Sequence, residues 1–298
     1  MTVGTPNLYY PDDITRLSYP SLQCPRCKLE FPANRTLVMG ILNITPDSFS
    51  DGGKYFSVNQ AITHALQMVQ DGADIIDIGG ESSRPGAALV STDEEINRIV
   101  SVIERIAKET NIPISVDTYK AKVAKTAIDA GAQIINDITA MTSDSEMFSL
   151  AAKTGVPVIL MHIQGSPQTM QLNPQYQNVV SDITTYLNNA ILNAKNNGII
   201  ENQIVIDPGI GFGKAIEHNL TILNHLSDFV ALGRPMLIGV SRKSFIGKIL
   251  DLPVEQRLEG TAAAVAISVL NGAKIVRVHD VKEMIRVVKI ADAIRTAK

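Results

Sequence analysis

The sequence lacks the features that mark membrane-spanning, secreted and nucleic-acid-binding proteins. Its longest smooth apolar stretches, such as residues 157–161, have the length of a strand and are far shorter than a membrane-spanning helix. The N-terminus has neither the basic start nor the apolar core of a secretory signal. The net charge of −3 disfavours a broad electrostatic attraction to nucleic acid. We therefore expect a cytoplasmic globular protein that binds neither membranes nor nucleic acid.

Cysteine is scarce, and the two cysteines of the chain, Cys24 and Cys27, lie together in the motif CPRC. This spacing is typical of half a zinc site or of a redox pair. A structural zinc site needs further ligands, and the sequence offers neither a second CxxC nor a nearby pair of histidines. A redox CxxC normally opens a helix, whereas residues 28–31 that follow here are predicted to form a short strand. A small hairpin over residues 21–35 is therefore the favoured interpretation, with the zinc and redox sites as alternatives.

The rest of the chain has an ordinary globular composition, with 45% hydrophobic and 19% charged residues over 298 positions. From residue 36 onward, short apolar runs alternate with longer helix-like runs. The expected strands are 36–42, 74–78, 114–117, 133–136, 156–161, 203–206, 236–240 and 274–278, and the expected helices are 58–71, 94–109, 120–130, 144–153, 178–197, 215–226, 257–271 and 280–296. This alternation favours an α/β fold with a parallel sheet, and eight units favour a closed (β/α)8 TIM barrel over an open doubly wound sheet. The predicted organisation is an N-terminal arm and hairpin, residues 1–35, followed by the barrel, residues 36–298.

Polar side chains follow the predicted strands at the ends where a barrel of this type carries its active site. They are Asn43, Asp117, Asn136, Asp137, His162, Asp207, Arg277 and His279, together with the segments GGESSRPG and SRKS. Singly, each has a structural explanation: Asp117 could brace a helix start, His162 could be a core histidine, and Arg277 could pair with an aspartate. Asn136 and Asp137 face opposite ways in a strand, so at most one of them points into the barrel mouth. The convergence predicts a site, because burying such groups is costly unless they are paired or used.

Two long loops rich in glycine and serine, residues 45–53 and 79–87, follow the first two strands. Loops of this kind commonly cover a barrel site and move, although flexible surface loops have the same composition. Arg84, beside Pro85, could present its charge to an anion. Arg277 and His279 point the same way along their strand, which suits a diphosphate.

The glycines of DPGIGFGK superficially suggest a nucleotide loop. Pro208 stands where the P-loop needs its first glycine, and Ala215 stands where it needs serine or threonine. These glycines are therefore expected to shape the sixth loop or to let the backbone approach a flat ligand.

The runs MGILNITPDSFSDGG (39–53) and ADIIDIGGESSRPGA (73–87) resemble the two signatures of the dihydropteroate synthases. The segments ISVDTYK, INDITA, MHIQGSPQTMQ, IDPGIGFGK, IGVSRKSFIG and VRVHDV resemble further blocks of that family, in the family's order. The resemblance covers about residues 36–298 and departs at Ser83 and Ile163, where the family commonly has Thr and Met. It implies a (β/α)8 barrel and a transferase of folate biosynthesis. The implied reaction joins (7,8-dihydropterin-6-yl)methyl diphosphate to 4-aminobenzoate, giving 7,8-dihydropteroate and diphosphate.

The resemblance also implies roles for individual residues. It assigns the pterin to Asp117, Asn136, Asp207, Lys243 and Arg277, the diphosphate to Asn43, Arg277 and His279 with a Mg²⁺ ion held by Asn43, and the 4-aminobenzoate to Phe49, Ser83, Arg84, Pro85 and Ser244. Asp117, Lys243 and Arg277 are the implied catalytic residues, and the carboxylate of Asp117 would stabilise a methylene cation as diphosphate leaves. The family is commonly dimeric, so a homodimer is expected. The small-residue helix at 261–270 could form its interface or pack on the barrel.

Two other functions fit a pterin pocket in such a barrel. A methyltetrahydrofolate:corrinoid methyltransferase has no diphosphate to expel, so the two long loops with Arg277 and His279 favour the synthase. A non-catalytic pterin-binding protein would be expected to have lost Asp117, Lys243 or Arg277, and all three are present. Release of diphosphate distinguishes these functions.

Overall fold

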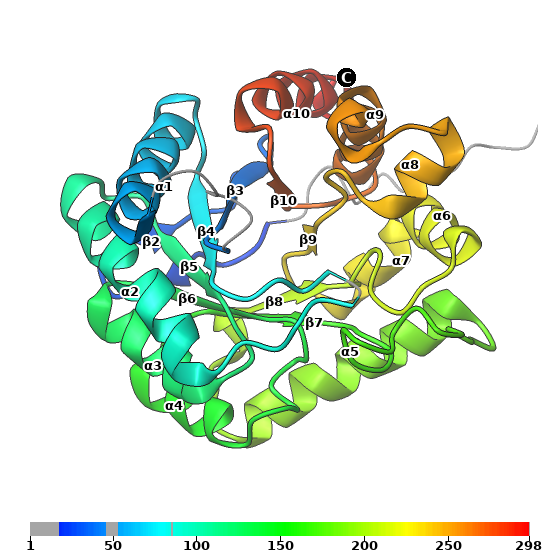
Figure 1. The fold of residues 1–298 in the computed structure, drawn as a ribbon. Coiled ribbons are helices and arrows are strands. Elements are labelled where there is room, and N and C mark those ends of the chain that lie inside the picture. The colour runs from blue at the N-terminus through cyan, green and yellow to red at the C-terminus, as the bar shows by residue number, and fades with distance from the viewer. Residues whose placement is uncertain (1–17, 46–52, 85, 298) are drawn as a thin grey trace, which may run out of the picture.

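The computed structural model describes residues 18–45, 53–84 and 86–297, and of residues 53–57 it describes the backbone alone. Its centre is an eight-stranded sheet in the order β8-β7-β6-β5-β4-β3-β10-β9. Every paired neighbour in this sheet runs parallel, and a parallel bridge between Ile206 and Met236 joins β8 to β9. Figure 1 shows the strands around the centre with the helices outside them. The predicted TIM barrel is thus confirmed, and the open doubly wound sheet is wrong.

The elements follow the predicted alternation closely. The strands are β3 (Leu37–Asn43), β4 (Ile75–Gly79), β5 (Ile114–Asp117), β6 (Ile134–Asp137), β7 (Val158–Met161), β8 (Ile204–Asp207), β9 (Leu237–Ile238) and β10 (Ile275–Val278). The helices are α1 (Gly53–Gln70), α2 (Thr92–Glu109), α3 (Ala121–Ala130), α4 (Glu146–Thr154), α5 (Val179–Asn196), α6 (Ile216–Asn224), α7 (Leu226–Phe229), α8 (Ser244–Leu250), α9 (Leu258–Leu270) and α10 (Val281–Thr296). The predicted helix 215–226 was too long, because the chain leaves helical geometry at His225 before α7 begins. Helix α1 begins earlier than predicted, and the short α8 precedes α9.

The barrel forms because its strands are apolar on both faces and its helices on one. All five residues of β4 are buried, as expected for a strand covered from inside and outside. Helix α2 buries Ile99, Val102, Ile103 and Ile106, a spacing that places them on one face toward the sheet. Its start is set by Ser91, whose hydroxyl accepts the backbone N–H of Glu94 at 3.3 Å. The carboxyl ends of the parallel strands therefore all lie at one rim of the barrel.

The N-terminal hairpin lies across the opposite end of the barrel. Its strands β1 (Leu22–Gln23) and β2 (Lys28–Leu29) pair antiparallel, and the N–H of Cys24 donates to the carbonyl of Cys27 at 2.9 Å in the turn. Four apolar side chains of this segment are buried, namely Tyr19, Leu22, Leu29 and Phe31. They form one cluster with residues near the starts of the barrel strands, namely Leu37, Met39, Ile75, Ile134, Ile159, Val205, Leu237 and Ile275. We call this cluster the barrel floor.

The predicted hairpin is therefore present, and both of its cysteines are free thiols. The division of the chain into an arm with a hairpin, residues 1–35, and a barrel, residues 36–298, stays a prediction. The hairpin packs on the barrel. In the described ranges of the chain, no helix is both long and apolar enough to cross a membrane.

Candidate active site

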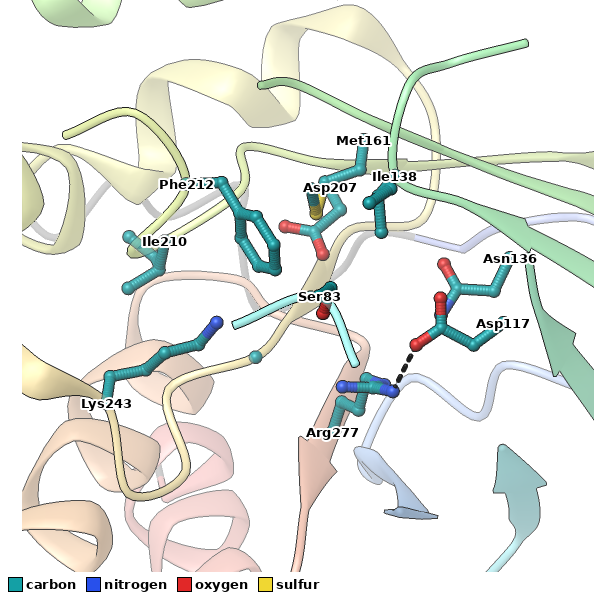
Figure 2. Close-up of a pocket in the computed structure, with 11 residues that line it drawn as sticks. Ser83, Asp117, Asn136, Ile138, Met161, Asp207, Ile210, Phe212, Lys243 and Arg277 are labelled. Atoms are coloured by element: carbon teal, nitrogen blue, oxygen red, sulfur yellow. Dashed lines mark hydrogen bonds and ion pairs between the residues drawn. The ribbon is translucent and has the colours of Figure 1, made fainter. Parts of the chain in front are cut away.

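A pocket opens at the carboxyl ends of the barrel strands, on the side away from the floor. It is lined by Ser83, Asp117, Asn136, Ile138, Met161, Asp207, Ile210, Phe212, Gly239, Lys243 and Arg277. Figure 2 shows these side chains converging from several strands and loops on one space. Six of the residues expected to bind substrate thus line a single pocket. The apolar members, which the sequence did not single out, give it walls suited to a flat ring.

Arg277 is held in the pocket by two carboxylates. Its Nε lies 2.6 Å from Oδ2 of Asp77, and its Nη2 lies 2.7 Å from Oδ2 of Asp117. The amide of Asn136 donates to the same Asp77 oxygen at 3.1 Å. The pairing of Arg277 with an aspartate, which the sequence left as its alternative, is therefore present, and Arg277 still faces the pocket. Charge-assisted bonds of this kind fix both the position and the plane of a guanidinium.

Asp77 is the polar residue that sequence reasoning missed. It is fully buried, and its Oδ1 has no hydrogen-bond partner among the described residues. The signal was present, because a carboxylate in the apolar strand IIDIG has to find a cationic partner. Asp77 accepts hydrogen bonds from both Arg277 and Asn136, and so orients both side chains.

Burial sets the protonation of the pocket carboxylates. Desolvation raises the pKa of Asp117 to about 7, although the adjacent Arg277 opposes this rise. Desolvation also raises the pKa of Asp207 to about 6, against the backbone N–H of Gly209, which donates to its Oδ1 at 2.7 Å. Both groups can therefore change charge near neutral pH.

Lys243 faces these carboxylates from the loop after β9. Its Nζ lies 4.0 Å from the centroid of the Phe212 ring, which places the cation on an aromatic face. Desolvation lowers its pKa to about 8, and the charge of Arg277 acts in the same direction. Lys243 thus stays positive at neutral pH with little margin.

The sixth loop carries its glycines where the backbone needs them. Gly209 has φ +72°, and a Cβ on it would lie 1.9 Å from the carbonyl oxygen of His162. Lys214 fixes the end of this loop: its Nζ lies 2.9 Å from Nδ1 of His162 and 2.9 Å from the carbonyl oxygen of Phe212. Burial lowers the pKa of His162 to about 2, so it is a neutral core histidine, as the sequence allowed. This loop holds Asp207 and Phe212 in the pocket wall.

Four expected binding residues stand outside the pocket lining. Asn43 ends β3, and Arg84 is exposed in the loop after β4. Ser244 is exposed at the start of α8, which has only 7 residues. His279 follows β10, with Nδ1 2.9 Å from Oγ of Ser241, and burial lowers its pKa to about 3.

Three other residues named from the sequence are Asp137, Phe49 and Pro85. Asp137 is absent from the pocket lining, and its Oδ1 accepts from the N–H and the hydroxyl of Thr139, both at 2.7 Å. Phe49 and Pro85 lie outside the described residues.

A metal at this rim would have few protein ligands. The described part of the chain contains no cluster of three or more His, Cys, Asp or Glu side chains that could hold an ion. A Cβ on Gly79 would lie 3.8 Å from Oδ1 of Asn43 and 3.7 Å from Oδ2 of Asp117, so both oxygens flank the same backbone position. One amide oxygen completed by phosphate oxygens and water is a normal arrangement for Mg²⁺. The donor set therefore fits Mg²⁺ bound together with a diphosphate.

Comparison with known proteins gives a consistent result. Residues 39–279 match the family described as "Pterin binding enzyme". Dihydropteroate synthase of Bacillus subtilis is 52% identical over 87% of this chain and 88% of its own length. The structure of Xanthomonas albilineans dihydropteroate synthase with 4-aminobenzoic acid superposes with a TM-score of 0.88 at 40% identity, covering 94% of this chain and 100% of that one. The complex of the X. albilineans enzyme with 7,8-dihydropteroate gives a TM-score of 0.85 at 38% identity, with the same coverage of both chains.

Proposed function

Since the chain belongs to the dihydropteroate synthases of the pterin-binding enzyme family, we infer that it joins (7,8-dihydropterin-6-yl)methyl diphosphate to 4-aminobenzoate. The products are 7,8-dihydropteroate and diphosphate, and the activity is that of a transferase in folate biosynthesis. Among the structural observations, the pocket with Asp117, Asn136, Asp207, Lys243 and Arg277 on one rim carries this conclusion. It offers two carboxylates, an amide and two cations to a flat polar ring.

The pterin is proposed to bind deep in the pocket. Its amino group and ring N–H groups donate to Asp207 and Asp117, while Lys243 donates to the ring carbonyl or a ring nitrogen. Asn136 supplies both donor and acceptor. Arg277, whose plane is set by Asp77, stacks on the ring. Such a set rejects analogues that leave one of these buried groups unpaired.

The chemistry is proposed to begin with loss of diphosphate. The C–O bond to the methylene breaks, both electrons leave with diphosphate, and Asp117 stabilises the cation that remains. Arg277 and an N–H of the neutral His279 imidazole bind the leaving diphosphate. Asn43 would hold Mg²⁺, which supplies further charge neutralisation there when bound. The amine nitrogen of 4-aminobenzoate then forms the C–N bond and loses a proton to solvent. No strong base is needed.

The second substrate is proposed to bind under the loop after β4. Ser83 lines the pocket, and Arg84 follows it. The positive charge of Arg84 acts on Lys243, so the guanidinium lies within electrostatic reach of the pocket. We assign the carboxylate of 4-aminobenzoate to Arg84 and the hydroxyl of Ser244.

The direct test measures diphosphate release from the pterin diphosphate and Mg²⁺, with and without 4-aminobenzoate. Release coupled to formation of dihydropteroate is expected. Pterin binding without release in either case would refute the synthase and favour the methyltransferase or a non-catalytic binder.

We further propose a homodimer formed through the last three helices. Helix α9 packs against α8 and α10, and these helices expose Ile249, Leu250, Ile267, Ile290 and Ile294. Exposed apolar side chains on neighbouring helices are a feature of many interfaces. Sedimentation of the wild type and of Ile290→Lys tests this proposal: a dimer that the substitution dissociates supports it, and a monomeric wild type contradicts it.

A cytoplasmic location is the proposal that fits two free thiols, because reducing compartments keep cysteines in that state. Cell fractionation with a cytosolic marker tests it.

A further inference from the structure

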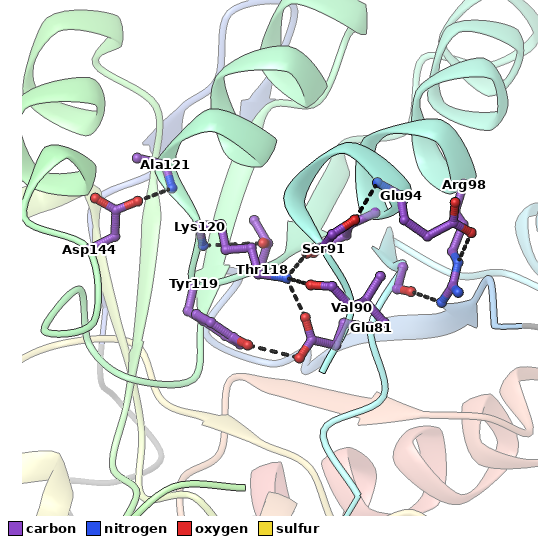
Figure 3. A network of polar contacts seen from close by, with 12 residues as sticks. Glu81, Val90, Ser91, Glu94, Arg98, Thr118, Tyr119, Lys120, Ala121 and Asp144 are labelled. Atoms are coloured by element: carbon purple, nitrogen blue, oxygen red, sulfur yellow. Dashed lines mark hydrogen bonds and ion pairs between the residues drawn. The ribbon is translucent and has the colours of Figure 1, made fainter. Parts of the chain in front are cut away.

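The loop that joins β4 to α2, residues 80–91, is tied at both ends to one lysine. Nζ of Lys120 contacts the carboxylate of Glu81 near the loop's start and lies 2.6 Å from the carbonyl oxygen of Val90 near its end. It also lies 2.7 Å from Oε2 of Glu95 in the first turn of α2. Figure 3 shows Glu81 and Val90 beside Lys120. One cation thus joins the entry and the exit of the loop.

We propose that Lys120 is a positioning residue for the second substrate: by joining Glu81 and Val90 it holds the β4–α2 loop over the pocket for capture of 4-aminobenzoate. This inference rests on the proposed function, which assigns that substrate to Ser83 and Arg84. Both residues lie in the span between the two held ends. Lys120 lies on the rim itself, three positions after Asp117 in the sequence.

The contacts of Lys120 are well protected from water. Its side chain is 17% exposed, that of Glu81 is 10% exposed and that of Glu95 is 1% exposed. The hydroxyl of Tyr119 donates to Oε1 of Glu81 at 2.8 Å, so both oxygens of this carboxylate are used. Ion pairs in such surroundings are screened far less than surface pairs, and removing one partner leaves a buried charge behind. Loss of Lys120 would therefore leave the buried carboxylates of Glu81 and Glu95 without their cation.

A neighbouring contact supports the same segment. Nη1 of Arg98 donates to the carbonyl of Gly80 at 2.8 Å, and its Nε pairs with Glu94 at 2.9 Å. The two ends of the loop are thus held, while Arg84 and Leu89 between them are exposed. Ends that are ordered before binding lower the entropy cost of fixing Ser83 and Arg84 on a ligand.

The test is a steady-state comparison in which each substrate is varied while the other is saturating. Lys120→Met is expected to raise KM for 4-aminobenzoate about tenfold to a hundredfold, the range for a misplaced binding group, with KM for the pterin diphosphate nearly unchanged. Arg84→Ala provides the reference for loss of capture. Lys120→Arg, which keeps the charge, is expected to restore part of the affinity. Purely structural damage would affect both substrates alike, so the split between the two KM values identifies positioning.

Two further variants guard against misfolding. Glu81→Ala removes the first anchor of the loop and leaves the pair between Lys120 and Glu95 intact, so it is expected to show the same selective rise in KM. Lys122→Met removes an exposed pair with Asp93 that lies 2.8 Å apart, and it is expected to change neither KM. Unchanged KM for 4-aminobenzoate in the folded Lys120 and Glu81 variants, or an equal rise for both substrates, overturns the proposal. A wild-type protein that forms no dihydropteroate refutes instead the function on which the proposal rests.

Discussion

Asp117 meets two demands at the scale of a single side chain. It accepts a charge-assisted bond from Arg277, and it borders the pocket where positive charge is proposed to develop. Asp77 shares Arg277 but is fully buried. The two carboxylates therefore differ in role: Asp77 holds the guanidinium, and Asp117 also faces the pocket where the substrate is proposed to bind.

The substitution Asp117→Asn tests this division. The amide keeps an acceptor for Arg277 but carries no charge, so kcat is expected to fall by about a hundredfold or more while the Kd of the pterin diphosphate changes only a few-fold. Single-turnover kinetics and calorimetry measure the two quantities. Asp207→Asn is the matched control and is expected to weaken pterin binding first. Equal losses of turnover and affinity in Asp117→Asn would contradict the assignment.

The pocket pKa values predict a window of pH for pterin binding. Binding uses ionised Asp207, so affinity is expected to fall as the pH drops through its pKa of about 6. It uses the protonated form of Lys243, so affinity is expected to fall again as the pH rises through about 8. Calorimetry across this range, with the ligand titrated alone as a control, measures both limits. Lys243→Arg should remove the alkaline limit, because a guanidinium stays charged; an unchanged limit would exclude Lys243 as its cause.

At the scale of the elements, the sequence was informative wherever the signal was local. Apolar runs of strand length predicted the barrel, and the polar residues that end those runs predicted Asn136, Asp207 and Arg277 at one rim. It could not predict contacts that depend on closure of the barrel. The pair of Asp77 and Arg277 joins residues 200 positions apart, and neither sequence neighbourhood specifies the other.

The same limit applies to the loops. Composition predicts a loop at residues 79–87 that either covers the site or is flexible surface, but it does not predict the connection through Lys120. A lysine near a helix start is usually a surface residue, and only the tertiary fold brings Glu81, Val90 and Glu95 around it. The position of Phe212 beneath Lys243 likewise follows from the course of the sixth loop.

The sixth loop supports a prediction about backbone conformation. Gly209→Ala would place a Cβ against the carbonyl of His162 at a positive φ, so we expect a loss of about 2–3 kcal/mol in the free energy of unfolding and weaker pterin binding. Gly233→Ala is the matched control, because Gly233 has φ +67° with nothing within 4 Å of its Cβ position. It should lose only the cost of the strained φ, about 1 kcal/mol. Urea unfolding measures both, and equal losses would show that the clash is relieved by movement.

For the whole molecule, the barrel floor and the pocket are expected to be separable. Phe31→Ala removes a buried ring from the floor, so the free energy of unfolding should fall by about 3 kcal/mol. Both KM values should stay unchanged in the folded fraction, since the pocket lies at the other end of the strands. Lys28→Ala, at an exposed position of the same hairpin, is the control. A change in either KM for Phe31→Ala at low temperature would show that the two ends are coupled.

The hairpin at the barrel floor also offers a place where the protein can be attached to a surface in one orientation. Its turn lies at the opposite end of the barrel from the rim that carries the pocket, and it has two free thiols at Cys24 and Cys27. Burial raises the pKa of both thiols, so alkylation would be slow at neutral pH and faster in alkaline buffer. A surface or a fluorophore coupled there would leave the mouth facing solution, and every immobilised molecule would present its pocket in the same direction.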